Sequence, residues 1–243
     1  MNLFSKDFID KFDFYLDSFD EAINLQSKIG FTEKELTQFD SLQQNLIKSY
    51  LFFAESTNTT AIGALRLFNS NLHSDTYSLI RIIYEIACVM HYGNISNENK
   101  LEVYKVFFKS ELTGEDQSKS EWKLIQKSQR QFELEKEGLI PVRKELNNYG
   151  SHLSSKKMFI GNLTVLESAS ASSLFIDNSG KDEFLKGLEF LHFMYNLVLE
   201  EYAEHLLSCN GATITDMKNI QTNTNGITNR IRPRLMNMRN KNI

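Results

Sequence analysis

The sequence predicts an all-α protein, a multi-helix bundle arranged around a central buried helix over residues 72–93. The chain has 243 residues with only 2 prolines and 11 glycines, which favours long helices over a β-sandwich or barrel. It is 41% hydrophobic and 24% charged, so it can bury a substantial core. Most of its segments also repeat apolar residues at the spacing of one helix face.

Residues 72–93 are expected to form the central helix. Nearly every residue between Leu79 and Met90 is apolar, and a helix that is apolar on all sides is a buried one. Ser74 is a favourable N-cap residue near the start of the segment. Gly93 stands where a C′ glycine ends a helix. The segment is therefore expected to be one helix with defined ends.

Three helical pieces are expected before the central helix. Their ranges are about 5–27, 32–55 and 61–68. Thr32 and Glu35 have the spacing of a capping box, in which each side chain bonds the other residue's backbone N–H. The polar, Thr-rich residues 56–60 predict a kink or short loop between the second and third pieces.

The second half of the chain contains further helices and one segment without a helical pattern. The expected helices cover about 98–112, 119–137, 141–148 and 179–209. A charged loop is expected at 114–118, and Asn210-Gly211 is expected to close the last long helix. Short apolar runs flanked by Gly, Asn and Ser predict a small irregular or hairpin excursion near 156–179.

The charge distribution divides the chain into 1–212, expected to be a single helical-bundle domain, and 213–243, expected to be a polar, basic C-terminal tail. Residues 217–243 contain six basic and no acidic residues, although the net charge of the whole chain is −4. The rest of the chain therefore has 21 basic and 31 acidic residues, a net charge of −10. The Asn- and Thr-rich composition after residue 212 predicts at most a short helix.

The basic tail has two interpretations. A charge asymmetry of this kind can mark contact with nucleic acid, in which Arg230, Arg232 and Arg234 would bind phosphates. The tail lacks interleaved aromatic residues for base stacking, which favours a tail that folds back on the acidic body or stays solvated.

The sequence favours a cytoplasmic protein without a cofactor. Its N-terminal residues lack the basic and apolar regions of a signal peptide, and its longest apolar run is shorter than the ~20 residues that span a bilayer. Cys88 and Cys209 have neither a metal-ligand spacing nor a disulfide framework, which fits a reducing compartment. Nucleotide-binding and zinc motifs are absent, so no cofactor or metal is expected. His91, His192 and His205 lie on or beside apolar faces and are expected to be core or surface histidines.

The central helix contains the first candidate site, Arg81 and Glu85. These residues are four apart and share one helix face, with Tyr77 one turn earlier. In a functional interpretation, Arg81 binds an anion such as a phosphate and Glu85 holds the guanidinium or acts as a base, while Tyr77 contacts the substrate. In a structural interpretation, the two charges form a buried ion pair that ties helices together.

A second group of polar side chains lies at the predicted helix end near residue 150. It comprises Asn148, Tyr149, Ser151 and His152. His152 is suited to act as an acid or base near neutral pH, with the other three binding substrate. The alternative is a C-cap turn, in which His152 bonds the last helix carbonyls. Together with Arg81 and Glu85, the group would suit a metal-independent phosphodiester site.

The stretch Ser-Leu-Ile-Arg-Ile-Ile-Tyr-Glu at 78–85, followed by Asn-Tyr-Gly-Ser-His at 148–152, resembles a group of uncharacterised bacterial helical proteins. In that group an Arg-x-x-x-Glu helix precedes a Ser-x-x-x-His turn, and Asn148 here holds the place of the serine. The group is more remotely similar to the HEPN superfamily, helical dimers that include toxin and phage-defence ribonucleases. The HEPN signature is an Arg and a His separated by four to six residues, and Arg66 and His73 match it formally.

The resemblance implies a homodimer that binds or cleaves RNA in bacterial defence or stress response. It would place the chemistry of a metal-independent ribonuclease on Arg81, Glu85 and His152. The competing prediction is a non-enzymatic protein–protein interaction module, in which the Arg–Glu pair is structural. Neither prediction involves a membrane.

Overall fold

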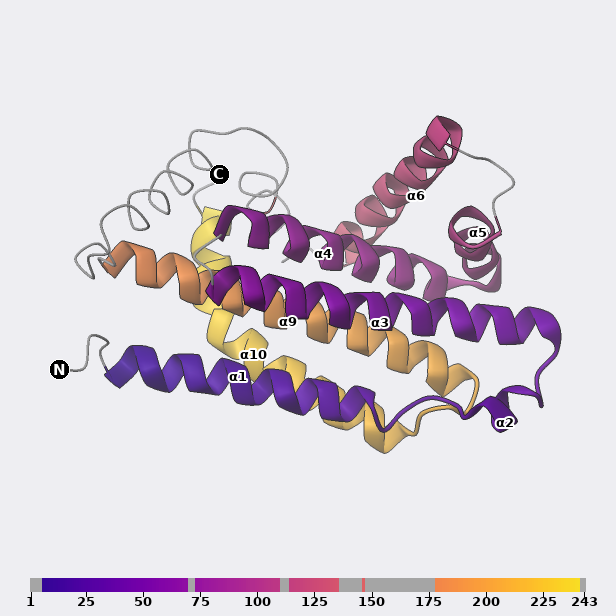
Figure 1. Ribbon diagram of the computed structural model, residues 1–243, viewed down its shortest axis with the longest axis horizontal. Coiled ribbons are helices and arrows are strands. Elements are labelled where there is room, and N and C mark those ends of the chain that lie inside the picture. The colour runs from indigo at the N-terminus through magenta and orange to yellow at the C-terminus, as the bar shows by residue number, and fades with distance from the viewer. Residues whose placement is uncertain (1–5, 70–72, 110–113, 136–145, 147–177, 241–243) are drawn as a thin grey trace.

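The computed structural model describes residues 6–69, 73–109, 114–135, 146 and 178–240 (Figure 1). These residues form helices and turns without a strand, which confirms the predicted all-α class. The helices, labelled as in Figure 1, are α1 (Lys6–Gln26), α2 (Glu33–Leu36), α3 (Ser41–Asn69), α4 (His73–Ile95), α5 (Asn97–Phe107), α6 (Gly114–Glu135), α9 (Asn178–Ser208) and α10 (Ile214–Asn240). The helix expected at 141–148, apart from the buried residue Leu146, lies outside the described residues. So does the excursion expected near 156–179, apart from its last two residues, which begin α9.

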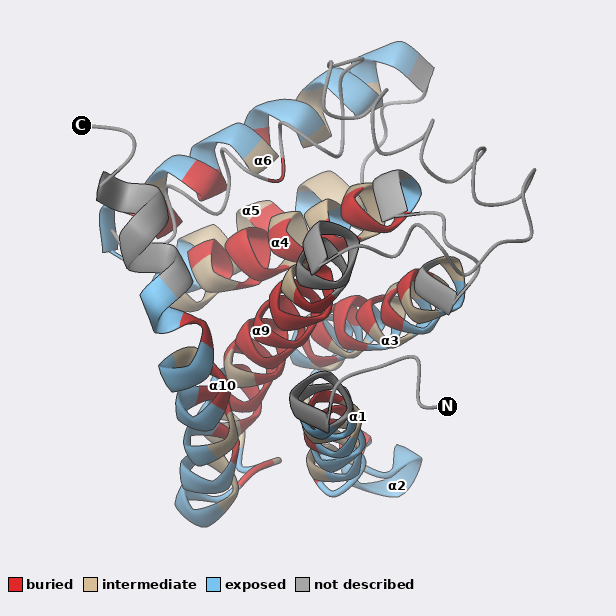
Figure 2. Ribbon diagram, turned by 90° about the vertical axis from the view of Figure 1, so that its left-hand side faces the viewer, coloured by how far each residue is buried: buried red, intermediate tan, exposed pale blue. Residues whose placement is uncertain are grey.

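Three long helices, α3, α4 and α9, pack against one another and form the centre of the bundle (Figures 1 and 2). On one side, α1 and α10 pack against α9 and against each other. On another side, α5 and α6 pack against α4 and against each other. The predicted central helix, α4, is thus contacted by α3, α5, α6 and α9, and it shares the central position with α9.

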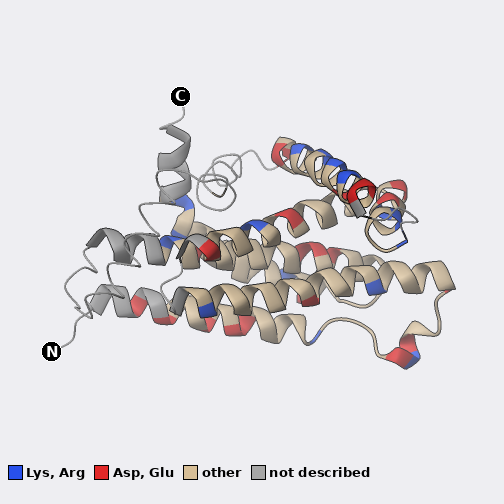
Figure 3. Cartoon of the chain, turned by 45° about the horizontal axis from the view of Figure 1, so that its top comes forward, with Lys and Arg blue, Asp and Glu red and all other residues tan. Residues whose placement is uncertain are grey.

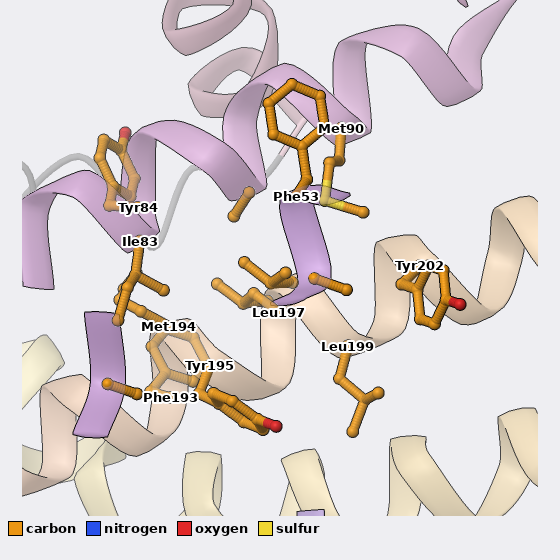
Figure 4. Packing of buried hydrophobic residues seen from close by; sticks show 14 of the residues in the cluster. Phe53, Ile83, Tyr84, Met90, Phe193, Met194, Tyr195, Leu197, Leu199 and Tyr202 are labelled. Carbon is orange, nitrogen blue, oxygen red and sulfur yellow. The ribbon is translucent and has the colours of Figure 1, made fainter. Parts of the chain in front are cut away.

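The apolar core follows α9 along much of its length. Every residue from 187 to 199 is buried, and Figure 2 shows this stretch as continuous red. Figure 4 shows part of the cluster, in which Met194, Tyr195 and Leu197 of α9 accompany Ile83 of α4 and Phe53 of α3. Complete burial of one such apolar side chain contributes about 1.5–3 kcal/mol. This core holds α4, and with it the candidate site, in a fixed position.

Residues 56–60 continue α3, so the predicted short loop is wrong. The hydroxyl group of Thr57 donates to the carbonyl of Phe53 at 2.9 Å, and that of Thr60 donates to the carbonyl of Ser56 at 2.7 Å. Threonine hydroxyls that bond four residues back are satisfied inside the helix. A Thr-rich stretch is therefore compatible with an unbroken helix here.

The helix predicted over 32–55 is interrupted between Leu36 and Ser41. The predicted capping box is confirmed, because the N–H of Thr32 donates to the Glu35 carboxylate at 2.7 Å and the N–H of Glu35 donates to the Thr32 hydroxyl at 3.3 Å. The helix that it starts, α2, has only 4 residues. Asp40 then accepts a hydrogen bond from the N–H of Gln43 at 2.8 Å, which caps the start of α3.

Gly93 lies inside α4, which continues to Ile95, so the prediction of a C′ glycine is wrong. Gly93 is buried, and a β-carbon at this position would overlap the hydroxyl group of Tyr50 from α3. That hydroxyl group donates to the carbonyl of Met90 at 3.2 Å. Gly93 therefore allows a close approach of α3 to α4 and does not end a helix.

The boundaries of α6 and α9 give one wrong and one confirmed prediction. Residues 114–118 begin α6, so the predicted loop is wrong, and two acidic residues in this first turn interact favourably with the helix dipole. The predicted end of α9 is confirmed. Asn210 has a φ of 64°, and the N–H of Gly211 donates to the carbonyl of Leu206 at 2.8 Å, as in a Schellman motif.

The segment after residue 213 forms the 27-residue helix α10, although its composition predicts at most a short helix. The N–H of Thr213 donates to the Asp216 carboxylate at 2.8 Å, and the N–H of Asp216 donates to the Thr213 hydroxyl at 3.1 Å. Among its described side chains, 214–233, the buried residues of α10 are Ile220, Thr224, Ile227 and Ile231. Their spacing of four, three and four residues is that of one helix face, which explains how a polar segment packs against α9 and α1.

Candidate functional site

Helix α4 brings Arg81 and Glu85 into the contact that their spacing predicts. The Nε–H group of Arg81 donates to Oε1 of Glu85 at 2.9 Å. Each of the two side chains is 18% exposed, so the pair is neither sealed in the core nor fully solvated. The adjacent residue Ile82 is 45% exposed, which shows that α4 turns this side partly towards solvent.

The ion pair uses only one edge of the guanidinium group. Within the described part of the chain, neither Nη group of Arg81 has a hydrogen-bond or ion-pair partner. Each Nη carries two N–H donors, so four donors of the guanidinium remain available. Because Glu85 fixes the Nε edge, the group is oriented in advance for an anion that accepts two parallel hydrogen bonds.

The other residues predicted for this site are placed only in part. Tyr77 is 1% exposed, and its ring belongs to the apolar core. Asn148, Tyr149, Ser151 and His152 lie outside the described residues. The described geometry of the predicted site therefore consists of the Arg81–Glu85 pair and the buried Tyr77 one turn away.

The arginines predicted to bind nucleic acid lie on α10. Arg230 and Arg232 are exposed, and the side chain of Arg234 lies outside the described part of the chain. The Cζ atom of Arg230 is 3.3 Å from the centroid of the Phe14 ring in α1, which is a cation–π contact. Arg230 therefore connects α10 to α1, as the interpretation of a tail folded back on the body expects.

The structure shows a second polar cluster, centred on His91 of α4, that sequence reasoning missed. Nδ1 of His91 lies 2.8 Å from Oε1 of Glu201 in α9, and Nε2 lies 2.7 Å from Oε2 of Glu135 in α6. The side chain of Glu201 is only 3% exposed, whereas that of Glu135 is 40% exposed. Nδ2 of Asn94 also donates to Oε2 of Glu201, at 3.0 Å. His91 thus links three helices that are distant in the sequence.

The geometry around His91 suits a structural link. An ionised carboxylate only accepts hydrogen bonds, so with both glutamates ionised each ring nitrogen of His91 must carry a proton. An imidazolium in this position offsets the cost of burying a carboxylate charge on Glu201. Neither nitrogen keeps a free lone pair, so the ring is not arranged to take a proton from a substrate. Its partners are 110 and 44 residues away, and no local sequence pattern could have indicated them.

Cys88, one turn before the His91 cluster on α4, is not a nucleophile in this structure. Burial raises the pKa of its thiol well above the ordinary value. The neighbouring Tyr84 donates from its hydroxyl group to Oε1 of Glu133 at 3.0 Å, and burial raises the pKa of Tyr84 too. Since the thiolate is the reactive form of cysteine, a thiol held in its neutral form is unreactive near neutral pH.

The sequence predicts that His192 and His205 are core or surface histidines, and both lie in the core. Their exposed fractions are 0% and 2%, and the ring nitrogens of both lack hydrogen-bond partners among the described residues. Burial lowers the pKa of each imidazole to about 3, and Lys100 lowers that of His205 further. Both rings pack against aromatic side chains, with Phe19 edge-on to His192 and Tyr50 stacked on His205.

The fold and the site together define a class of protein, an all-α bundle with a half-buried Arg–Glu pair on a central helix. Comparison of the chain with known family models, curated proteins and solved structures finds no match. In the described ranges, no helix has the length and apolar character needed to cross a membrane. Across the same residues, no group of three or more His, Cys, Asp or Glu side chains is arranged to hold a metal ion.

Proposed function

We propose that the protein is a helical RNA-binding protein, in which Arg81 binds a backbone phosphate and Glu85 holds the guanidinium group in place. One observation carries the proposal, the 2.9 Å contact between Nε of Arg81 and Oε1 of Glu85 in a pair whose side chains are each 18% exposed. This contact leaves the Nη groups available. A phosphate offers oxygens that match their planar, forked arrangement.

Partial burial favours this role for Arg81. An attraction between charges strengthens as the surrounding dielectric falls, so a half-buried guanidinium binds an anion more strongly than one on a fully solvated side chain. The carboxylate of Glu85 opposes the anion electrostatically, but it also removes rotational freedom from the arginine side chain. A lysine at position 81 would keep the positive charge and lose the forked geometry.

A more specific proposal is that the protein is a metal-independent ribonuclease. It would act as a homodimer in the cytoplasm, in bacterial defence or stress response. The resemblance of 78–85 and 148–152 to HEPN-like proteins supports it. In this proposal His152 transfers a proton, Arg81 binds the phosphate under attack, and the other polar residues of 148–152 contact the substrate. The two free cysteines suit the reducing compartment.

The test measures RNA binding by the full chain through the fluorescence anisotropy of a labelled single-stranded RNA. We expect Arg81→Ala to weaken binding about tenfold, because a charge-assisted contact with a phosphate is lost. Arg81→Lys should give an intermediate affinity, because it keeps the charge without the fork. Lys48→Ala is the matched control, since Lys48 is exposed on α3 and its loss changes the net charge equally.

Cleavage of the same RNA, followed on gels, tests the more specific proposal. Wild-type protein is expected to cleave the RNA, and Arg81→Ala and His152→Ala are expected to leave it intact. Equal RNA affinity of wild type and Arg81→Ala would show that Arg81 does not bind the phosphate. Equal behaviour of all three proteins on the gel would remove the ribonuclease assignment.

The second candidate function is a non-enzymatic protein–protein interaction module with a structural Arg–Glu pair. The observation that favours it is Ile82, a large apolar side chain that is 45% exposed beside the pair. Sedimentation velocity on the same proteins separates the two functions. A wild type that binds no RNA but self-associates, together with an Ile82→Asp variant that is monomeric, would support the interaction module.

A further inference from the structure

Helix α6 presents a row of cations that neither the predicted site nor the predicted tail includes. The row consists of Lys119, Lys123, Lys127 and Arg130. These residues follow one another at intervals of four, four and three, which places them on one face of the helix. All four are exposed, and Figure 3 shows several blue segments along α6. The structure thus displays a positive strip on a protein whose net charge is −4.

Two of these cations are free to bind a ligand. Lys119 pairs with Glu115 at 2.8 Å, and Lys127 pairs with Glu102 at 2.9 Å. Lys123 and Arg130, in contrast, have no ion-pair partner in the described residues.

Helix α6 itself contributes few acidic side chains to this stretch. Between residues 117 and 131 the only acidic residue is Glu121. Glu121 is two residues from Lys119 and from Lys123, about 200° around the helix axis, so it lies on the other side of α6. It accepts a hydrogen bond from Nε2 of Gln117 at 2.7 Å.

An exposed tryptophan borders the row. Trp122 is the only tryptophan of the chain, and its side chain is 43% exposed. It is three residues from Lys119 and four from Gln126, so its indole ring flanks the cations on the helix surface. Cations combined with an exposed aromatic ring are the combination that binds single-stranded nucleic acid, because phosphates meet the charges and an unstacked base stacks on the ring.

The surface of α6 along the row is hollowed. The described residues that line the hollow are Lys123, Gln126, Lys127, Arg130, Gln131 and Leu134. Lys123 and Arg130 are seven residues apart, about 10 Å along the helix axis at 1.5 Å per residue. The hollow therefore contains both free cations and two glutamine side chains, which provide further hydrogen-bond donors.

We propose that this face of α6 binds single-stranded RNA, with Lys123 and Arg130 contacting phosphates and Trp122 stacking on a base. The proposal deepens the proposed function, on which it rests for RNA as the ligand. The acidic remainder of the surface repels a polyanion and so directs it towards the cationic row. A double helix keeps its bases stacked inside and has none to offer to the indole ring, so the single strand is the form that fits.

The fluorescence of Trp122 provides the test, because no other tryptophan contributes to the signal. We expect oligouridylate to quench this fluorescence, and inorganic polyphosphate, which has no bases, to leave it nearly unchanged. The Lys123→Ala/Arg130→Ala variant should bind oligouridylate about tenfold more weakly, and the slope of log affinity against log salt should fall by about 1.4, or 0.7 per lost phosphate contact. Trp122→Phe should keep most of the affinity in an anisotropy assay, and Trp122→Ala should lose about fivefold or more.

The matched control is Lys34→Ala/Lys48→Ala, which removes two positive charges from exposed positions on α2 and α3. The control should bind as wild type does. RNA binding without quenching, or quenching that Lys123→Ala/Arg130→Ala leaves intact, would overturn the α6 proposal while Arg81→Ala still tests the proposed function. Quenching that depends on Lys123 and Arg130 but not on Arg81 would support α6 and overturn the role of Arg81. Absence of any binding would overturn both.

Discussion

His91 joins α6 and α9 to α4 through one carboxylate on each ring nitrogen. The Glu201 side chain is 3% exposed, so water does not reach it to replace the imidazole. Removal of one partner from a buried charge pair costs more than the pair itself contributes, because the other charge stays buried without compensation. Loss of the His91 side chain should therefore lower the stability of the whole bundle.

We expect His91→Ala to lower the free energy of unfolding by about 3 kcal/mol, measured by urea denaturation with circular dichroism. Glu135→Gln is the matched control on the other nitrogen, and it should cost less because the Glu135 side chain is 40% exposed. Combining His91→Ala with Glu201→Gln should recover part of the loss, since the uncompensated charge is then gone. A double variant less stable than His91→Ala would argue against an ionised Glu201.

At the scale of helices, two glycines occupy opposite environments. Gly93 in α4 is buried, and a β-carbon there would overlap the hydroxyl group of Tyr50, a residue that is 0% exposed and stacked on His205. Gly226 in α10 is exposed, and a β-carbon there would have no atom within 4 Å. The same substitution therefore tests close helix packing at one position and helix propensity at the other.

Gly93→Ala should lower the free energy of unfolding by about 1–3 kcal/mol, because α3 and α4 must separate or the Tyr50 ring must move. Gly226→Ala should raise it by about 0.5–1 kcal/mol, because alanine loses less conformational entropy in a helix. Thermal unfolding of both variants checks the two signs. A stabilised Gly93→Ala protein would contradict the close approach of α3 and α4.

Helical spacing in the sequence predicts most of these elements, and the errors have physical causes. The Thr-rich sequence around Thr57 and Thr60 predicts an interruption of the helix, but the hydroxyl groups of both residues donate hydrogen bonds to carbonyls within α3. Gly93 reads as a helix end, but it serves the packing of two helices. The polar composition of α10 predicts at most a short helix, while the four buried positions among its described side chains, 214–233, are a small minority. The composition of a helix averages over all its faces, whereas packing against the bundle requires only one apolar face.

For the candidate site, the sequence predicts a contact between residues of one helix. It does not predict the contacts that form only where several helices pack together. The contact of Arg81 with Glu85 follows from a spacing of four residues on α4. The contacts of His91 with Glu135 and Glu201 exist only because α6 and α9 pack on α4, so they require the whole fold. The cationic row of α6 is visible in the sequence, yet its exposure beside Trp122 is known only from the packed structure.

The whole molecule should lose stability in acid because it buries two neutral histidines. Burial lowers the pKa of His192 and of His205 to about 3, whereas an imidazole in the unfolded chain has a pKa near 6.5. Between these values the unfolded chain binds protons that the folded protein does not, so stability is complete above about pH 6.5 and falls as the pH decreases towards 3. Each histidine should contribute a loss of about 2 kcal/mol between pH 7 and pH 5.

The variant His192→Leu isolates one of these contributions, because all other groups titrate alike in the two proteins. Urea denaturation at pH 7 and pH 5 should show a loss on acidification that is about 2 kcal/mol smaller for the variant than for wild type. The tight aromatic surroundings of His192, with Phe19 at 5.0 Å between ring centroids, make some loss of stability at both pH values compatible with this result. The test depends only on how much the free energy of unfolding changes between pH 7 and pH 5. An equal loss in both proteins would mean that His192 takes up its proton in the folded state as readily as in the unfolded chain, and that acid does not act on the bundle through its core.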